Sequence, residues 1–177
     1  MIGAWMRVLE TNRLVLRWLT IDDAEFIFDL LNQASFLHYI GDKGIRTIED
    51  ARKYILTGPI ASYERFGFGL YLAELKQTQI SIGICGLLKR ESLEDVDVGF
   101  AFLPQFWGQG YAFESAAAVL KYGRDALGLD RIVAITSPDN QASIRVLNKL
   151  GFNFQRMIRL SQNAPEIRLF TASNFAQ

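Results

Sequence analysis

One stretch in the middle of the chain, residues 96–120, constrains the fold more than any other. It begins with seven mostly apolar residues, VDVGFAF, which is typical of a buried strand. A Pro-Gln turn follows, and then an alanine-rich run with helical character begins at two glycines, Gly108 and Gly110. We therefore expect a strand, a sharp loop and a helix in direct succession.

The start of that helix is the chemically informative position. The first N–H groups of a helix have no internal partner and lie at the positive end of the helix dipole. Glycines carry no Cβ, so a phosphate can approach these amides closely. The pattern Gln105-x-x-Gly108-x-Gly110 therefore predicts a pyrophosphate site without a lysine, although turn glycines alone would also explain it. Two other glycine motifs fail, because Phe113 occupies the third glycine position of GxGxxG and no Gly-Lys-Ser/Thr follows.

The rest of the chain predicts an α/β protein with mixed strand directions. Residues 36–41 are expected to form a loop that lines a site, and Thr47 and Asp50 have the spacing of a capping box at a helix start. The expected strands are 13–19, 67–76, 79–89, 96–102, 131–136, 154–160 and 166–171, and the expected helices are 24–31, 47–56, 110–127 and 140–150.

Length and charge limit the classes of function. With 177 residues the chain is expected to be a single domain, 1–177, with residues 1–10 set apart as an extension that need not be ordered. Nineteen acidic residues balance nineteen Lys and Arg, so no long-range field favours nucleic acid or an acidic membrane. The single cysteine forms no internal disulfide, and no apolar run approaches the ~20 residues of a membrane span. We expect a cytoplasmic monomer or homodimer.

Several motifs in the right order resemble one known family. They are residues 11–17 (TNRLVLR), 97–102 (DVGFAF), 105–114 (QFWGQGYAFE), 140–143 (NQAS) and 148–152 (NKLGF). The chain resembles the GCN5-related N-acetyltransferase (GNAT) superfamily, and within it the ribosomal-protein N-terminal acetyltransferases. The resemblance implies a single-domain, mixed and mostly antiparallel sheet flanked by helices. It also implies that the sheet is splayed between the central strands 96–102 and 131–136, with acetyl-CoA in that gap as co-substrate and no metal.

The resemblance also assigns residues to the site. Ser143 becomes the candidate acid that protonates or hydrogen-bonds the CoA sulfur, and Asp97 the candidate base acting through water. Without the resemblance, each of these residues has a structural interpretation. Ser143 would be a solvated serine in the first turn of a helix, and Asp97 a strand residue that faces solvent. Asn140 would be the N-cap of its helix. The residues expected to bind the cofactor are Phe100, Phe102, Gln105, Gly108, Gln109, Gly110, Tyr111, Ala112, Asn140 and Ser143.

Other conspicuous side chains receive structural interpretations first. Glu114 is expected to complement the helix dipole and to orient the glycine loop. Cys85 lies among apolar residues and is expected to be buried and inert. His38, the only histidine, could lie at the mouth of an acceptor site. Trp107 is expected to be a packing anchor, while Phe36, Tyr39 and Phe66 could line the acceptor pocket or belong to the core.

These observations favour an acetyl-CoA-dependent N-acetyltransferase that moves the acetyl group directly to a primary amine. The acceptor would be a protein N-terminus or a small amine metabolite, because α-amines, with a pKa of ~7.7–8.0, need less help from a base than a lysine at ~10.4. The alternative is a non-catalytic acyl-CoA-binding or sensing module, and a flavin or nicotinamide enzyme is a more distant third.

Overall fold

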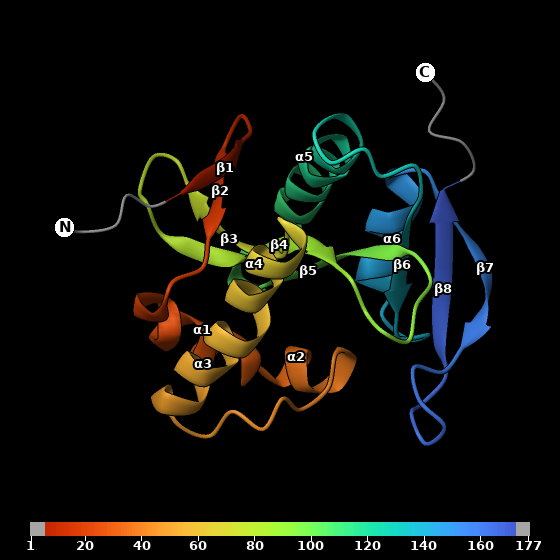
Figure 1. The fold of residues 1–177 in the computed structure, drawn as a ribbon, viewed down its shortest axis with the longest axis horizontal. Helices are drawn as coiled ribbons and strands as arrows, with labels where there is room; N and C mark the ends of the chain where they lie inside the picture. Colours follow the sequence, from red (N-terminus) through yellow and green to blue (C-terminus); the bar gives the residue numbers. More distant parts are fainter. Residues whose placement is uncertain (1–5, 173–177) are drawn as a thin grey trace.

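The computed structural model describes residues 6–172, which form one mixed sheet between two layers of helices (Figure 1). None of the helices within this part of the chain is long and apolar enough to span a membrane. The strands are β1 (Arg7–Glu10), β2 (Leu14–Trp18), β3 (Leu70–Leu75), β4 (Ser81–Leu88), β5 (Val96–Phe102), β6 (Ile132–Thr136), β7 (Phe152–Ile158) and β8 (Ile167–Ala172). The α-helices are α1 (Ala24–Leu31), α2 (Ala34–Tyr39), α3 (Ile48–Ile55), α4 (Ala61–Phe66), α5 (Tyr111–Asp125) and α6 (Gln141–Lys149).

The eight strands form one sheet in the order β1-β2-β3-β4-β5-β6-β8-β7. Every neighbouring pair is antiparallel except β5 and β6, which run parallel. The expected meander of β3, β4 and β5 is confirmed, and so is the central place of β6. In Figure 1 the sheet twists strongly, since β3 to β5 run across the view and β7 and β8 stand upright.

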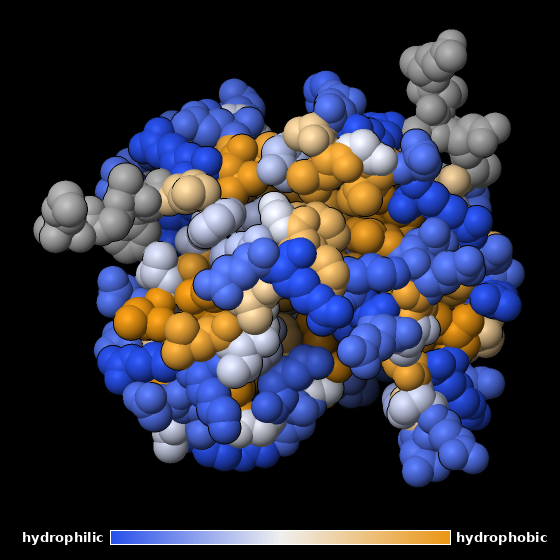
Figure 2. Space-filling model, viewed as in Figure 1, coloured by the Kyte–Doolittle hydropathy of each residue, from blue (hydrophilic) through white to orange (hydrophobic). Residues whose placement is uncertain are grey.

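Each face of the sheet carries its own apolar core, because successive side chains of a strand point to opposite faces. On β3, Tyr71 belongs to the core shared with Val119 of α5 and Leu147 of α6. Its neighbour Leu72 belongs to the core shared with Ile27 of α1 and with α3. Figure 2 shows hydrophilic residues over much of the viewed face, with apolar residues gathered in the region that α5 occupies in Figure 1 and in smaller groups near α1 and beside β8.

The parallel pair β5 and β6 separates almost at once. Its ladder contains only two pairs, Val96 with Ile132 and Asp97 with Val133. Beyond Asp97, β5 continues to Phe102 with no ladder partner on its β6 side within residues 6–172. The predicted splay between the central strands is confirmed, and it leaves strand-edge N–H and C=O groups that require partners.

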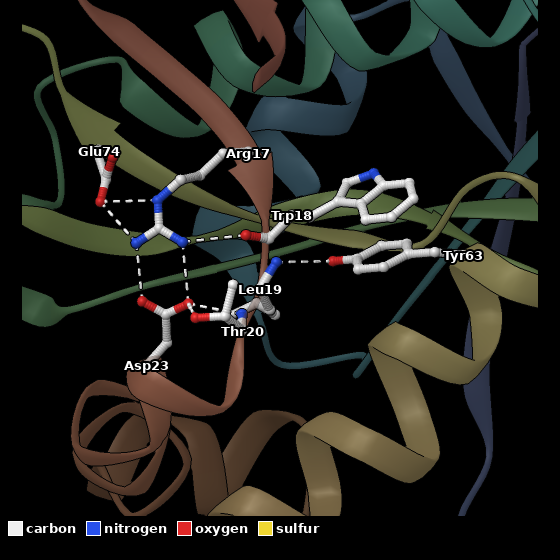
Figure 3. Close-up of polar contacts among 7 residues, drawn as sticks. All are labelled: Arg17, Trp18, Leu19, Thr20, Asp23, Tyr63 and Glu74. Carbon is white, nitrogen blue, oxygen red and sulfur yellow. Dashed lines mark hydrogen bonds and ion pairs between the residues drawn. The ribbon is translucent and has the colours of Figure 1, made fainter. Parts of the chain in front are cut away.

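A buried ion-pair network fastens the α1 layer to the sheet (Figure 3). The guanidinium of Arg17, on β2, donates to Asp23 just before α1 at 2.9 and 2.8 Å and to Glu74 of β3 at 3.0 and 2.8 Å. Beside it, the Tyr63 hydroxyl of α4 accepts from the Leu19 N–H at 3.1 Å. Breaking such a pair by removing one partner leaves a buried charge unpaired, which makes this network an anchor of the fold.

The structure differs from the sequence predictions at three places. Residues 7–10, which the sequence pattern assigned to an extension, form β1, while residues 1–5 lie outside the described part. The stretch 36–41, expected to be a loop, is mostly helix α2. Helix α4 was not predicted, because Gly58-Pro59 reads as a helix end. A π-helical turn, Leu56–Ile60, accommodates the proline and carries the chain from α3 into α4.

Candidate active site

A cavity of about 620 Å³ lies beside the part of β5 that has separated from β6, and α6 lines it as well. Its walls come from the end of β5, the start of α5 with the loop before it, α6 along its whole length, and one side formed by α1 and α2. The cavity thus brings together segments from residue 30 to residue 149, and each wall supplies a different kind of group.

The loop between β5 and α5 forms the first wall. Its two glycines have left-handed backbone angles, with φ of +73° at Gly108 and +84° at Gly110, a conformation that residues with a Cβ rarely adopt. Gly110 is the N-cap of α5 and supplies no side chain to the first helical amides. The Trp107 indole N–H donates to the Phe102 carbonyl at 2.7 Å, which fastens the loop to the strand. The predicted helix start therefore exposes amides to the cavity, as an anion site requires.

The N-terminus of α6 forms the second wall. Asn140 is its N-cap, and its side-chain oxygen accepts the Ser143 N–H at 3.1 Å, so the predicted capping role is confirmed. Both residues line the cavity, together with Ala142. The N-termini of α5 and α6 therefore both border one space, and each is a favourable place for a negatively charged group.

The third wall is the separated part of β5, where Phe100, Ala101 and Phe102 line the cavity. A chain rich in amides could pair with this free strand edge much as another strand would. Opposite lie Leu30, Phe36 and Ile40. The side chain of Ile40 is 46% exposed, and an apolar group in such a position gains free energy when a ligand covers it.

The charged residues of the cavity are all basic. Of the described residues that line it, only Arg145 and Lys149 are charged, and both come from α6. No Asp, Glu or His of residues 6–172 lines the space. No group of three or more His, Cys, Asp or Glu within the same residues could hold a metal ion. The charge of the lining therefore suits an anionic ligand.

Most of the residues predicted to bind the cofactor line this cavity. Gln105 and Gln109 do not. The Gln109 side-chain amide instead donates to the Gln105 backbone carbonyl at 3.1 Å. The lining residues from the predicted set are Phe100, Phe102, Gly108, Gly110, Tyr111, Ala112, Asn140 and Ser143.

Asp97 lies apart from the cavity lining. It is 1% exposed at the paired end of β5, and its Oδ1 accepts from the Arg90 Nε at 2.9 Å. Its Oδ2 is buried and has no hydrogen-bond partner among residues 6–172. Burial raises the pKa of Asp97 above its ordinary value, against the opposing effect of Arg90. Any contact with a reacting amine in the cavity would have to pass through intervening water.

Of the other residues singled out in the sequence, some lie in the protein core and others lie at or near the cavity. Cys85 is buried, and burial raises the pKa of its thiol to about 12, so it is a poor nucleophile. Phe66 packs on Phe68 away from the cavity, whereas Phe36 and Tyr39 line it. His38 does not line it, but bonds Asp139 at 2.8 Å and so links α2 to the loop before α6.

Sequence reasoning missed that α1 and α2 form a continuous wall. Gln33 and Ser35 belong to this wall, and both stand in a stretch without a periodic pattern. Only Phe36 and Tyr39 indicated from the sequence that this stretch could line a pocket, and they did not indicate that it is helical.

Comparison with known proteins agrees with this geometry. The uncharacterized N-acetyltransferase YoaA of Bacillus subtilis (strain 168) is 34% identical over 154 residues, covering 86% of each chain. Among solved structures, a GNAT-family acetyltransferase of Bacillus anthracis has 25% identity and a TM-score of 0.76, covering 92% of this chain and 96% of its own. The ribosomal L7/L12 alpha-N-protein acetyltransferase RimL, in complex with coenzyme A, shares the fold, with 18% identity, a TM-score of 0.80, and coverage of 93% and 96%.

The family profile decides the assignment. The profile described as an acetyltransferase (GNAT) domain matches residues 13–153, which include the glycine loop, both helix N-termini and the splayed strands. Relatives that cover most of the chain are named as N-acetyltransferases, which favours the enzyme over the non-catalytic module. The chain belongs to the acetyltransferase (GNAT) family.

Proposed function

We propose that this acetyltransferase takes its acetyl group from acetyl-CoA bound in the cavity that β5, α5 and α6 line. The observation that carries the proposal is the convergence of two helix N-termini and an unpaired strand edge on one space. The pyrophosphate would accept from the amides at Gly110 and the start of α5. The amide-rich pantetheine would run along residues 98–102 of β5. The RimL complex with coenzyme A supports this choice of ligand, because that protein has the same fold.

The reaction is a direct transfer in a ternary complex. The neutral amine nitrogen attacks the thioester carbon, a C–N bond forms, the C–S bond breaks, and the thiolate takes a proton. We assign Ser143 as the residue that hydrogen-bonds or protonates the CoA sulfur, because it lines the cavity. The bond from its backbone N–H to Asn140 fixes its position at the start of α6. The proton of the attacking amine leaves to solvent, because Asp97 lies outside the cavity lining.

The acceptor is an α-amine carried on a neutral, largely apolar group. No described carboxylate or histidine lines the cavity to deprotonate a strongly basic amine. At pH 7.5 an α-amine is roughly one-third neutral, whereas a lysine side chain is only about 0.1% neutral. The α2 wall, with Phe36 and Ile40, offers apolar contact to the acceptor, and Arg145 and Lys149 disfavour a polycation.

Two matched peptides test this function. Both have the same sequence, with one lysine and an apolar first residue. One has a free N-terminus and an acetylated lysine; the other has an acetylated N-terminus and a free lysine. Each is incubated with acetyl-CoA at pH 7.5, with thiol release followed by a chromogenic reagent and product mass by mass spectrometry.

We expect acetylation of the free N-terminus at a rate at least tenfold above that of the free lysine. The approximate neutral fractions differ by a few hundredfold, so a clear preference should survive differences in fit. Preference for the lysine would contradict the assigned acceptor. Absence of thiol release with both peptides and with small α-amines would contradict the proposed transfer reaction.

A further inference from the structure

An arginine from the N-terminal hairpin reaches the glycine loop from behind the cavity. Arg13 lies between β1 and β2, about one hundred residues before the loop in sequence. Its Nη1 donates to the Gln109 carbonyl at 2.9 Å, and its Nε donates to Glu114 Oε2 at 2.6 Å. Its guanidinium carbon lies 4.3 Å from the ring centroid of Tyr111, the first residue of α5. Three neighbours thus fix the position of one side chain.

Glu114 is itself held in place. Its Oε1 accepts from the Thr11 hydroxyl at 2.6 Å and from the Arg13 backbone N–H at 2.8 Å. Burial opposes its charge, but the hydrogen bonds from Thr11 and Arg13 outweigh burial and lower the pKa of the carboxyl below its ordinary value. Glu114 is therefore ionised at neutral pH and holds the guanidinium against the first turn of α5.

The contact with the Gln109 carbonyl determines which way the next amide points. In a trans peptide the C=O and the following N–H point in opposite directions, and the chain has no cis bond within residues 6–172. Arg13 takes the Gln109 carbonyl on the side away from the cavity, since neither residue lines it, whereas Gly110 does. The Gly110 N–H is thereby turned toward the cavity. It donates to no backbone acceptor within the described residues.

We propose that Arg13, held by Glu114, is a positioning residue for the donor. It fixes the Gln109–Gly110 peptide so that the amides at the start of α5 point at the donor pyrophosphate without touching the donor itself. The inference rests on the proposed function, because it takes acetyl-CoA as the ligand of the cavity. It also gives the residues 11–14, which belong to the family-like opening motif, a role in the reaction.

A purely stabilising ion pair is the competing explanation. The Arg13 side chain is 41% exposed, and ion pairs at such exposed positions contribute little to stability. Positioning and general stabilisation differ in one respect. Positioning affects only donors that carry the pyrophosphate, whereas loosening of the fold affects every donor.

The test uses Arg13→Met, which keeps the aliphatic stem, and Glu114→Gln, which keeps the shape of the carboxyl. Each variant is assayed with acetyl-CoA and with S-acetylpantetheine, which lacks the pyrophosphate and the adenosine, and slow turnover is read by product mass. Calorimetry gives the Kd of acetyl-CoA. Arg131→Met is the matched control, because Arg131 forms a similarly exposed pair with Asp95 at 3.1 Å, far from the loop in the fold.

We expect Arg13→Met to raise the KM and Kd for acetyl-CoA about tenfold, the effect of losing one oriented interaction with a charged group, while kcat changes less than twofold. Turnover of S-acetylpantetheine relative to the wild type should change less than twofold, and Arg131→Met should leave both donors unaffected. Glu114→Gln should also raise the KM and Kd for acetyl-CoA. If Arg13→Met fails to fold, Glu114→Gln is the variant that tests the proposal.

Equal losses with the two donors, or no change with either, would overturn the positioning role. A wild-type protein that binds no acetyl-CoA in the calorimeter would instead overturn the proposed function on which the inference rests. The two failures are therefore distinguishable in one set of measurements.

Discussion

Ser143 and Asp97 illustrate how far a single residue can be assigned from sequence. Both are assigned through the family resemblance, but the structure gives them different surroundings. Ser143 lines the cavity on the first turn of α6, while Asp97 lies at the paired end of β5 beside Arg90. A strand pattern shows which residue is polar, but the exposure of that residue depends on loops that fold over it. In this chain the loop after β4 brings Arg90 over Asp97.

Replacing Ser143 tests the assignment of the sulfur partner. Ser143→Ala should lower kcat about tenfold or more and change the KM for acetyl-CoA little, because the thiolate needs its hydrogen bond mainly in the transition state. Steady-state kinetics with saturating acceptor measures this. Ser143→Thr, which keeps a hydroxyl, should retain most of the turnover. A rise in KM with unchanged kcat would mean that Ser143 contributes to the binding of acetyl-CoA and not to the departure of the thiolate.

The burial of Asp97 predicts how the free energy of unfolding depends on pH. Because burial raises its pKa, the folded protein holds this proton more tightly than the unfolded chain. The stability it contributes is complete below the ordinary value of 3.8 and is lost as pH rises through the raised folded pKa. Asp97→Asn cannot ionise, so the variant should gain free energy of unfolding relative to the wild type as pH rises from about 4 toward 7.

Urea unfolding of both proteins across this range measures the difference. A relative gain that increases as the pH falls would mean that the native state favours the ionised carboxylate, contrary to the burial argument. The same variant should lose activity equally with α-amines of different pKa, because Asp97 lies outside the cavity lining. A loss concentrated on the more basic amines would instead identify Asp97 as the base.

At the scale of elements, the sequence predicted the helices whose ends carry recognisable chemistry. Thr47 and Asp50 form the capping box expected for α3, with hydrogen bonds of 3.1 and 2.8 Å. Helix α5 ends at Asp125, two residues before the predicted end, and Gly128 follows in a left-handed conformation, donating to the Arg124 carbonyl at 3.2 Å. Helix α2 has only six residues, lacks a capping side chain and buries mainly Phe36, so no periodic pattern could reveal it. Short elements are held by their neighbours rather than by their own sequence.

The glycine at the start of α5 provides a prediction with an internal control. Gly110→Val should weaken acetyl-CoA binding at least tenfold, or about 1.4 kcal/mol. A branched side chain is strained at a φ of +84°, and its Cβ would lie 3.3 Å from the Arg13 guanidinium. Calorimetry gives the affinity, and circular dichroism checks that the helices remain.

Gly128→Val controls for strain alone. Gly128 also has a left-handed φ, +65°, but a Cβ added there would meet no atom within 4 Å, and the residue lies at the opposite end of α5. This variant should lose stability and keep its affinity for acetyl-CoA. Equal affinity losses in the two variants would mean that the cavity responds to general strain in α5, and unchanged affinity in Gly110→Val would remove the loop from the donor site.

At the scale of the whole molecule, the site is a consequence of one topological feature. Parallel pairing of β5 and β6 lasts for two residue pairs, and the strands then separate between two helix N-termini. Strand order and mixed direction could be expected from the sequence through the family resemblance. The contacts that complete the site could not, since Arg13–Glu114 and His38–Asp139 each join residues 101 positions apart. Local patterns carry no information about such pairs.

The central claim is that this cavity is the donor site. A crystal structure of the protein with acetyl-CoA tests it most directly. We expect the pyrophosphate within hydrogen-bond distance of the Gly110 N–H and the first amides of α5, the pantetheine along residues 98–102, and the sulfur near the Ser143 hydroxyl. Acetyl-CoA bound elsewhere on the molecule, or a cavity that stays empty at saturating acetyl-CoA, would contradict the claim.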